Sequence, residues 1–385
     1  MTLQVAFPRL LLIGGGASQE LAAVMAELGL SRPFLVTDPY LWSSGKAEAL
    51  LGSLSAAGRS ARVFAETAPE PTVASIERAL ACLQAGDHDC VIGFGGGSPI
   101  DSAKMVAILA RHGGLCRDYK TPHLQNQAGL PIIAIPTTAG TGSEASRFAV
   151  ITDDASDEKM LCAGLAYLPV AALVDYKLTL SMPPRLTADT GIDALTHAIE
   201  AYVSRRANAF SDSFALAAMA AIAPHVRRAY TDPDNEEARE AMMIGATKAG
   251  IAFSNASVAL VHGMSRPIGA HFHVPHGLSN AMLLPAVTAW TAPSALPRYA
   301  RCARAMGLAG DEPDDLAVER LIAELKALNR DLETPSPSAF GINADKWRRL
   351  LPTMAMQALE SGSPTNNPRV PSADEIQMIY QEVWS

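Results

Sequence analysis

The sequence predicts a two-domain protein, with an α/β nucleotide-binding domain over residues 1–184 and an all-helical domain over residues 185–385. Three observations support this fold class. Before the pair Pro183-Pro184, short apolar runs that end in glycine alternate with helical patterns, which is typical of an α/β domain. After that pair, long amphipathic runs follow with little β-branched alternation. The length of 385 residues also exceeds the roughly 250–300 residues at which single cores stop growing.

Composition indicates a folded, enzyme-like chain and excludes some partners. Apolar residues make up 49% of the chain and charged residues 18%, which is typical of a protein with a large core. Because charges are sparse, an apolar interface is expected, and with it a homodimer or a higher homo-oligomer. The net charge is −8 and no basic stripe runs along the sequence, so we expect no nucleic-acid partner.

The five cysteines are scattered and never form a C-x-x-C pair, so they indicate neither a disulfide framework nor a thiolate metal site. The N-terminal region lacks a basic segment followed by an apolar one, and no apolar run reaches the ~18 residues that a membrane span needs. We therefore expect buried thiols, no membrane partner and a cytoplasmic protein.

The first strand, helix and strand are expected between Arg9 and Asp38. An apolar run ends in three glycines, a helical pattern follows, and a second apolar run leads to Asp38. A carboxylate at the end of that strand can accept hydrogen bonds from the adenosine ribose hydroxyls and repel a 2′-phosphate, which favours NAD over NADP. Alternatively, Asp38 caps a helix or closes a turn.

The next expected strand, Cys90–Phe94, leads into the turn Gly95-Gly96-Gly97-Ser98, and Pro99 suits the first turn of a following helix. Glycines let backbone N–H groups close on an anion, and a helix N-terminus adds partial positive charge, so this turn suits a pyrophosphate. The turn matches neither the G-x-G-x-x-G nor the Walker A pattern. Taken by itself, it is equally compatible with a plain tight turn.

Residues 131–146 combine a buried strand with a loop of small hydroxyl residues. Thr137, Thr138 and Ser143 offer donors and acceptors where the phosphates and nicotinamide of a nucleotide could lie. A loop held together by hydroxyl-mediated turns is the alternative. Further along, we expect helices over four amphipathic runs, residues 212–230, 236–253, 314–329 and 373–384.

The most informative stretch of the second half places Asp193 and His197 four residues apart in a helix-forming run. That spacing puts both side chains on one helix face. A carboxylate and an imidazole that face the same way are half of a site for iron, zinc or manganese. His262 and His276 are the candidates for the other half, in a segment that holds four of the chain's nine histidines.

Taken together, four motifs resemble those of the iron-dependent (group III) alcohol dehydrogenases. They are the segments 95–104, 136–144 and 190–202, and the paired segments 261–264 and 275–277. The resemblance extends through Asn366-Asn-Pro-Arg369 and so covers nearly the whole chain. It implies the architecture shared with dehydroquinate synthase, an active site between the two domains, and a metal held by Asp193, His197, His262 and His276.

The resemblance also implies the cofactors and the substrate class. It points to divalent iron, or zinc in its place, to NAD, and to a small-molecule alcohol or aldehyde as substrate. Matching the motifs residue by residue, we expect NAD to contact the following: Asp38, Gly95, Gly96, Gly97, Ser98, Asp101, Thr137, Thr138, Ser143, Lys159 and Leu178.

Two positions depart from the family pattern. Many members have a second histidine one helical turn after the third metal ligand, where this chain has Arg266. A guanidinium cannot relay a proton at neutral pH but can hold a carboxylate or phosphate, so we hypothesise a pocket for aldehydes with a charged or polar tail. Alternatively, Pro267 ends the helix and Arg266 turns outward. Proton transfer would then fall to water, His271 or His273. The second departure is Glu70, where many members have asparagine.

We therefore predict a metal-dependent, NAD(H)-linked oxidoreductase that interconverts a primary or small polar alcohol and its aldehyde by hydride transfer. Three alternatives remain open. One is a hydroxyacid–oxoacid transhydrogenase, in which the bound nicotinamide serves two substrates without leaving. Another is a lyase of the dehydroquinate synthase type, although its phosphate-binding cluster of Lys and Arg is hard to find here. The last is a redox-silent protein that only binds NAD and metal.

Overall fold

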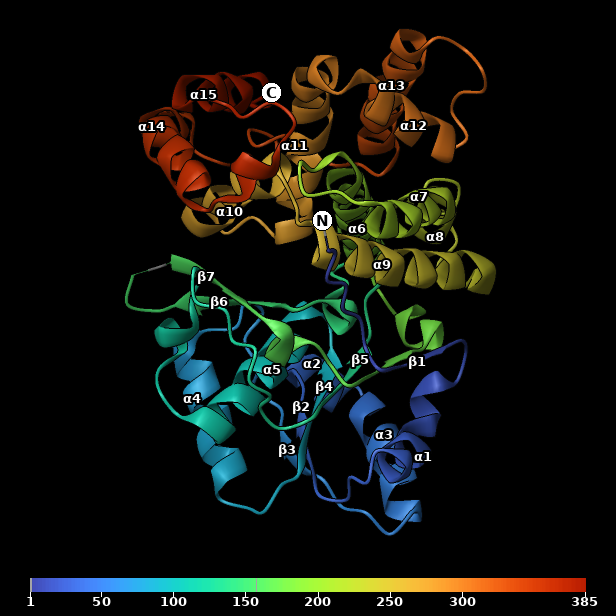
Figure 1. Cartoon of the computed structure of the whole chain (residues 1–385), viewed down its shortest axis with the longest axis vertical. Coiled ribbons are helices and arrows are strands. Elements are labelled where there is room, and N and C mark those ends of the chain that lie inside the picture. Colours follow the sequence, from blue (N-terminus) through green and yellow to red (C-terminus); the bar gives the residue numbers. More distant parts are fainter. Residues whose placement is uncertain (1, 157) are drawn as a thin grey trace. The chain divides into compact units, whose positions relative to one another are not determined.

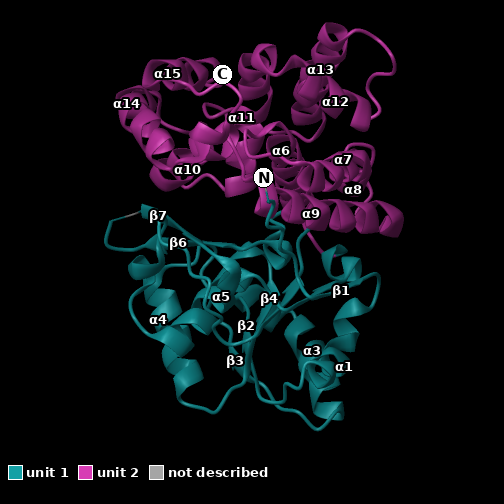
Figure 2. Ribbon diagram, viewed as in Figure 1, with its two compact units in different colours: residues 1–180 teal, residues 181–385 magenta. Residues whose placement is uncertain are grey.

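The computed structural model describes residues 2–156 and 158–385, and the chain divides into two compact units. Unit 1 comprises Met1–Leu180 and unit 2 comprises Ser181–Ser385 (Figure 2). Unit 1 is an α/β structure and unit 2 is helical, so the fold class predicted from the sequence is confirmed. Each unit is described below by itself.

Unit 1 is built around a six-stranded parallel sheet with the strand order β1-β8-β5-β4-β2-β3 (Figure 1). The short apolar runs form these strands, and those at the centre are buried along their whole length because helices cover both faces. A separate antiparallel pair, β6 and β7, was not expected from the sequence. The strands are β1 Leu10–Ile13, β2 Pro33–Val36, β3 Arg62–Phe64, β4 Cys90–Gly95, β5 Ile132–Pro136, β6 Phe148–Asp153, β7 Glu158–Ala163 and β8 Ala171–Val174.

Alternate residues of the strands enter two cores, one on each face of the sheet. Phe34 and Val36 of β2 pack with α4 and α5, whereas Leu35 packs with α1, α2 and α3. The helices of this unit are α1 Leu21–Glu27, α2 Pro39–Ser43, α3 Lys46–Ala56, α4 Val73–Gln84 and α5 Gly97–His112, with short 3-10 turns at Ala17–Glu20, Cys116–Tyr119, Ser143–Ala145, Leu165–Tyr167 and Tyr176–Thr179.

The strand order places a topological switch point between β2 and β4. After β2 the chain continues to β3 at one edge, whereas after β4 it continues to β5 in the opposite direction. Ligands of open α/β sheets bind at the carboxyl ends of the strands beside such a point. Asp38, Gly95 and Thr137 follow or end β2, β4 and β5, so three neighbouring strands bring the predicted nucleotide segments to one edge of the sheet.

Unit 2 consists of helices packed around α6, whose residues from Thr187 to Val203 are all buried. This helix packs against α7, α8, α9 and α11. The expected run 212–230 is split into α7 and α8 by a turn that contains Pro224, a residue that disfavours a continuous helix. The helices are α6 Pro184–Val203, α7 Ala209–Ile222, α8 Val226–Thr231, α9 Glu236–Ala256, α10 Leu260–Phe272, α11 His276–Thr291, α12 Leu296–Ala305, α13 Asp314–Asp331, α14 Ala344–Glu360 and α15 Ala373–Glu382, with 3-10 turns at Ala292–Ser294 and Ser363–Asn366.

Across the described residues, no single helix is both long and apolar enough to cross a membrane, although α9 and α10 together pass that test with a bend of 104° between them.

The first turn of α11 approaches α6 so closely that only glycine fits. A Cβ added at Gly277 would lie 2.4 Å from the carbonyl oxygen of Asp189 and 3.3 Å from Cβ of Asp193. The carbonyl belongs to the backbone of a buried helix and cannot move aside easily. Gly277 therefore sets the distance between the two helices at the point where they carry Asp193 and His276.

Replacing Gly277 with alanine is expected to force α11 away from α6. Overpacking of this kind costs about 1–3 kcal/mol, so Gly277→Ala should lower the melting temperature measured by circular dichroism. Gly52→Ala is the matched control, because Gly52 lies inside α3 with no atom within 4 Å of an added Cβ. That variant should melt at or above the wild-type temperature. A Gly277→Ala protein that melts like the control would contradict the close approach.

Candidate metal and cofactor sites

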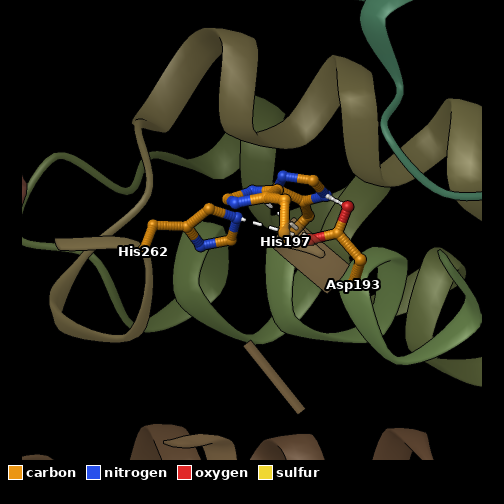
Figure 3. A group of neighbouring side chains, drawn as sticks. Asp193, His197 and His262 are labelled. Carbon is orange, nitrogen blue, oxygen red and sulfur yellow. Dashed lines mark ion pairs between the residues drawn. The ribbon is translucent and has the colours of Figure 1, made fainter. Parts of the chain in front are cut away.

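The structure brings four predicted metal ligands together in unit 2. Asp193 and His197 come from α6, His262 from α10 and His276 from α11, and one ligand atom of each lies within 4.8 Å of all the others. Figure 3 shows the side chains of Asp193, His197 and His262 turned toward one another. Residues that span more than 80 positions of the sequence, from Asp193 to His276, thus form one donor group of a carboxylate and three imidazoles.

The separations between these atoms suit a divalent metal. Asp193 lies 3.9 Å from Nδ1 of His197, 3.6 Å from Nε2 of His262 and 3.8 Å from Nε2 of His276. Ligands bound at about 2.0–2.2 Å from one metal ion are themselves about 3–3.5 Å apart. The carboxylate–imidazole separations are thus a few tenths of an ångström longer than those around a bound ion, and all four donor atoms lie within 4.8 Å of one another.

Local sequence explains how His276 reaches the group. His273 ends α10 in the left-handed conformation, with φ of 55°. Pro275 then precedes α11, in which His276 is the first residue. This tight connection turns the chain back, so that the first residue of α11, His276, lies near the first turn of α10 with His262, beside α6.

Neighbouring charges and burial shift the pKa values of the ligand side chains in opposite directions. Burial raises the pKa of Asp193, but the neighbouring His197, His262 and His276 hold the pKa of this carboxyl well below its usual range. Burial lowers the pKa of His262, whereas the carboxylates of Asp193 and Glu200 raise that pKa above the ordinary value. Asp193 is thus a buried, negatively charged carboxylate surrounded by imidazole nitrogens. Such an environment favours a bound cation.

Glu200 supports the group from behind, and the sequence analysis did not identify it. Its carboxylate accepts a hydrogen bond from Nδ1 of His262 at 2.7 Å and from the backbone N–H groups of Ala259 at 2.9 Å and Val261 at 2.6 Å. A protonated Nδ1 leaves Nε2 of His262 with its lone pair toward Asp193, as a metal ligand requires. The available signal was position, since Glu200 follows His197 by three residues on a fully buried helix.

Asn280 is the second residue that sequence reasoning missed. Its Nδ2 donates to Oδ1 of Asp193 at 2.7 Å and lies 3.1 Å from Nε2 of His262 and 3.3 Å from Nε2 of His276. The amide N–H₂ of Asn280 therefore lies among three acceptor atoms, one from each of Asp193, His262 and His276, whose lone pairs point to the same place. These same lone pairs would bind a cation, so the residues present fit a divalent metal such as iron or zinc.

One ligand is more exposed than the other three. The side chain of His276 is 40% exposed, whereas those of Asp193, His197 and His262 are 3–7% exposed. A catalytic metal keeps an open coordination position, while a structural one is enclosed. The exposed side of the group at His276 is where a substrate oxygen could enter.

The three residues predicted to be catalytic, Arg266, His271 and His273, differ in their surroundings. Arg266 is half-buried on α10, one turn after His262, and α10 continues through Pro267 to Phe272. His271 bonds to Gln357 at 2.8 Å, and His273 is an exposed helix cap. Neither histidine joins the group of metal-ligand candidates found within the described residues.

In unit 1, the glycine turn after β4 forms a cradle that side chains would fill. Gly95 has φ of +151°, and a Cβ there would lie 2.5 Å from Cγ of Pro99. The Cβ positions of Gly96 and Gly97 face Thr138 and Thr141. Oγ1 of Thr138 is buried and has no hydrogen-bond partner among residues 2–156 and 158–385, so it can serve a ligand. The turn opens α5, whose free N–H groups suit a pyrophosphate.

Two of the predicted NAD contacts bind each other and a buried lysine. Oγ of Ser143 donates to Asp101 at 2.5 Å and accepts from Nζ of Lys104 at 2.8 Å. Burial lowers the pKa of Lys104 to about 8, opposed by the charges of Asp101 and Glu144. The same lysine donates to the carbonyl of Phe148 at 2.7 Å, so this network fixes the hydroxyl loop to α5 and β6.

The remaining predicted contacts also have protein partners. Oδ1 of Asp38 accepts from N–H of Leu41 at 2.8 Å and caps α2, as the alternative reading proposed. Ser98 donates to the carbonyl of Pro69, and Lys159 pairs with Glu70 at 2.6 Å. Thr137 is buried, and the carbonyl of Leu178 accepts from Lys46 at 3.5 Å. The pairing with Glu70 was not foreseen from the sequence.

Comparison with known proteins identifies similar chains along nearly the whole length. The model of the iron-containing alcohol dehydrogenases matches residues 8–176, and that of the C-terminal part of the Fe-containing alcohol dehydrogenase family matches residues 187–384. Long-chain-alcohol dehydrogenase 1 of Geobacillus thermodenitrificans (strain NG80-2) is 38% identical over 375 residues, which cover 93% of this chain and 94% of that protein.

Solved structures agree with this comparison. A 1,3-propanediol oxidoreductase superposes with a TM-score of 0.95 at 32% identity and covers 100% of both chains. A sulfoacetaldehyde reductase from Bifidobacterium kashiwanohense, solved in complex with NAD+, superposes with a TM-score of 0.90 at 27% identity and covers 100% of this chain and 99% of its own.

Removing one histidine of the metal group should remove the metal. His197→Ala is expected to lose bound metal and alcohol dehydrogenase activity while keeping the wild-type circular dichroism spectrum. Metal content is measured by atomic absorption after gel filtration. His112→Ala in unit 1, where the ring bonds to the backbone carbonyls of Gln127 and Ala128, is the control and should retain metal. Wild-type metal content in His197→Ala would refute the assignment of this ligand.

Weakening the hydrogen bond from His262 to Glu200 should weaken metal binding without removing a ligand. Glu200→Gln replaces one carboxylate oxygen with an N–H₂ donor, which then faces either the N–H of Val261 or the N–H groups of Ala259 and His262, so the support of His262 is weakened. We expect metal affinity, measured by competition with a chelator, to fall by about 10–100-fold. Unchanged affinity would show that Glu200 serves the fold alone.

Proposed function

The chain belongs to the iron-containing alcohol dehydrogenase family, and from this premise we propose that it converts a primary or small polar alcohol and NAD+ into the aldehyde, NADH and a proton, and catalyses the reverse reaction. The observation that carries this proposal is the buried group of one carboxylate and three imidazoles, with Glu200 holding His262.

The proposed metal site is formed by Asp193, His197, His262 and His276. Divalent iron, when bound there, supplies a Lewis acid that lowers the pKa of an alcohol and polarises an aldehyde carbonyl. Burial of Asp193, His197 and His262 excludes water from one side of the group. The exposed ring of His276 leaves the other side accessible to a substrate oxygen. Zinc is the alternative metal, because both ions accept nitrogen and carboxylate ligands.

The proposed nucleotide site lies at the carboxyl ends of β2, β4 and β5. The backbone of Gly95–Ser98 and the start of α5 would bind the pyrophosphate. The loop with Thr138 would contact the nicotinamide half, supported by the network of Asp101, Lys104 and Ser143. Asp38 would accept the ribose hydroxyls with the oxygen that does not cap α2.

We also propose a homo-oligomer and a cytoplasmic location. Charged residues make up only 18% of the sequence, which favours an apolar interface between copies. Sedimentation of the purified enzyme would measure the number of copies.

The direct test measures oxidation of added NADH with a panel of aldehydes and 2-oxo acids while metal content is followed in parallel. Steady consumption of NADH with an aldehyde alone supports the dehydrogenase. A transhydrogenase would consume little added NADH and would instead transfer hydride between two organic substrates. An enzyme loaded with metal that reduces no member of the panel would contradict the proposal.

The role of Asp38 in choosing the cofactor can be separated from its role as a helix cap. Asparagine caps helices as well as aspartate does but has no charge. Asp38→Asn should therefore keep the wild-type melting temperature while the ratio of kcat/KM for NADH to that for NADPH falls, because repulsion of the 2′-phosphate is lost. Asp38→Gly should lower the same ratio and also weaken α2. If the wild type prefers NADPH, Asp38 does not select the cofactor.

A further inference from the structure

Arg266 carries a charge that has no partner within the described chain. It forms no ion pair and no hydrogen bond there, although unit 2 pairs many of its arginines, including Arg185, Arg227, Arg298 and Arg304. The residue is half-buried and not at the surface of a loop. Its nitrogens are not among the buried polar atoms that lack a partner in the described chain, so they are accessible from outside the protein. The guanidinium is therefore free to bind an anionic ligand.

The helix places Arg266 beside the metal group. It follows His262 by four residues on α10, which runs without interruption from Leu260 to Phe272 despite Pro267. Side chains four residues apart share one face, and helical side chains lean toward the N-terminus of their helix. The guanidinium of Arg266 thus leans back over the turn that carries His262. The earlier alternative, in which Pro267 ends the helix, does not apply.

Glu200 attracts Arg266 but does not pair with it. The charge of Glu200 acts against the burial that lowers the pKa of Arg266, so the two groups are near each other. Yet the carboxylate of Glu200 is already occupied by His262 at 2.7 Å, Ala259 at 2.9 Å and Val261 at 2.6 Å. The five N–H donors of the guanidinium remain available to an anion. The pKa of arginine is high enough that the group stays charged at neutral pH.

We propose that Arg266 binds a carboxylate or another anionic group at the far end of the substrate, so that this enzyme prefers aldehydes and alcohols with a negatively charged tail. The inference rests on the proposed function, because the reacting oxygen of such a substrate must reach the metal group at His262 and His276. The planar fork of the guanidinium matches two oxygens of a carboxylate, sulfonate or phosphonate. A neutral tail of equal length leaves it unpaired.

The test compares substrates that differ only in the charged end. 3-Hydroxypropionate and 4-hydroxybutyrate are compared with 1-propanol and 1-butanol, with NAD+ and metal-loaded enzyme. A hydrogen-bonded charge pair contributes enough for about a tenfold or larger change. In Arg266→Gln, the ratio of kcat/KM for each acid to that for its neutral partner should therefore fall about tenfold or more. Arg266→Lys, which keeps the charge, should restore part of it.

Controls separate this effect from general losses. Arg348→Gln removes an exposed arginine of α14, so it changes the net charge equally and should leave the ratio unchanged. Binding of 3-hydroxypropionate without NAD+, followed by calorimetry, should weaken in Arg266→Gln and not in Arg348→Gln. Circular dichroism shows whether each variant is folded.

Each outcome decides a different question. If the ratio and the binding of 3-hydroxypropionate are the same in wild type and Arg266→Gln, the inference is wrong while the proposed function stands. If the KM for NAD+ rises instead and the ratio stays constant, Arg266 binds a cofactor phosphate, which also overturns the inference. If the wild type oxidises neither the acids nor the neutral alcohols, the proposed function itself fails.

Discussion

The active end of unit 2 depends on two buried carboxylates of one helix, Asp193 and Glu200, with His262 held between them. Nε2 of His262 lies 3.6 Å from Asp193 and Nδ1 lies 2.7 Å from Glu200, so one ring connects both acids. Because a buried anion is unfavourable unless it is paired, these carboxylates constrain everything near them. α10 must present its N-terminal N–H groups to Glu200, and α11 must approach α6 closely enough at Gly277 for His276 to reach Asp193.

Unit 1 also contains a buried charged side chain, but a positive one. Lys104 is completely buried, and its ammonium group is satisfied by Ser143, Ser146 and Phe148 and by the nearby Asp101. A buried charge of this kind is specific about geometry, because losing any partner leaves it uncompensated. It therefore holds the hydroxyl loop in one conformation against α5. Both units thus use a buried charge on a helix to fix the loop or helix that carries the site.

Sequence patterns anticipated the features that follow from local rules. The spacing of Asp193 and His197, the glycine turn at Gly95 and the change from short apolar runs to long helices each depend on a short stretch of chain, and the fold class followed from them. Contacts between distant positions could not be anticipated, because they depend on packing. The approach of Asn280 to three ligand atoms and the pairing of Lys159 with Glu70 are examples. Asp38 lies between these cases, since its position at the end of a strand is compatible with both a helix cap and a ribose contact, and the cap is the one observed.

Formal charges connect the metal group to Arg266. Asp193 and Glu200 contribute two negative charges to a buried region whose histidines are neutral when they bind a metal. A divalent ion would balance those two charges and leave the region neutral. Arg266 then adds one positive charge that no described residue pairs with; burial lowers its pKa, and the charge of Glu200 opposes that effect. Because the metal balances the two acids, the charge of Arg266 is left for a ligand of opposite charge. The anionic end of the substrate proposed above is such a ligand.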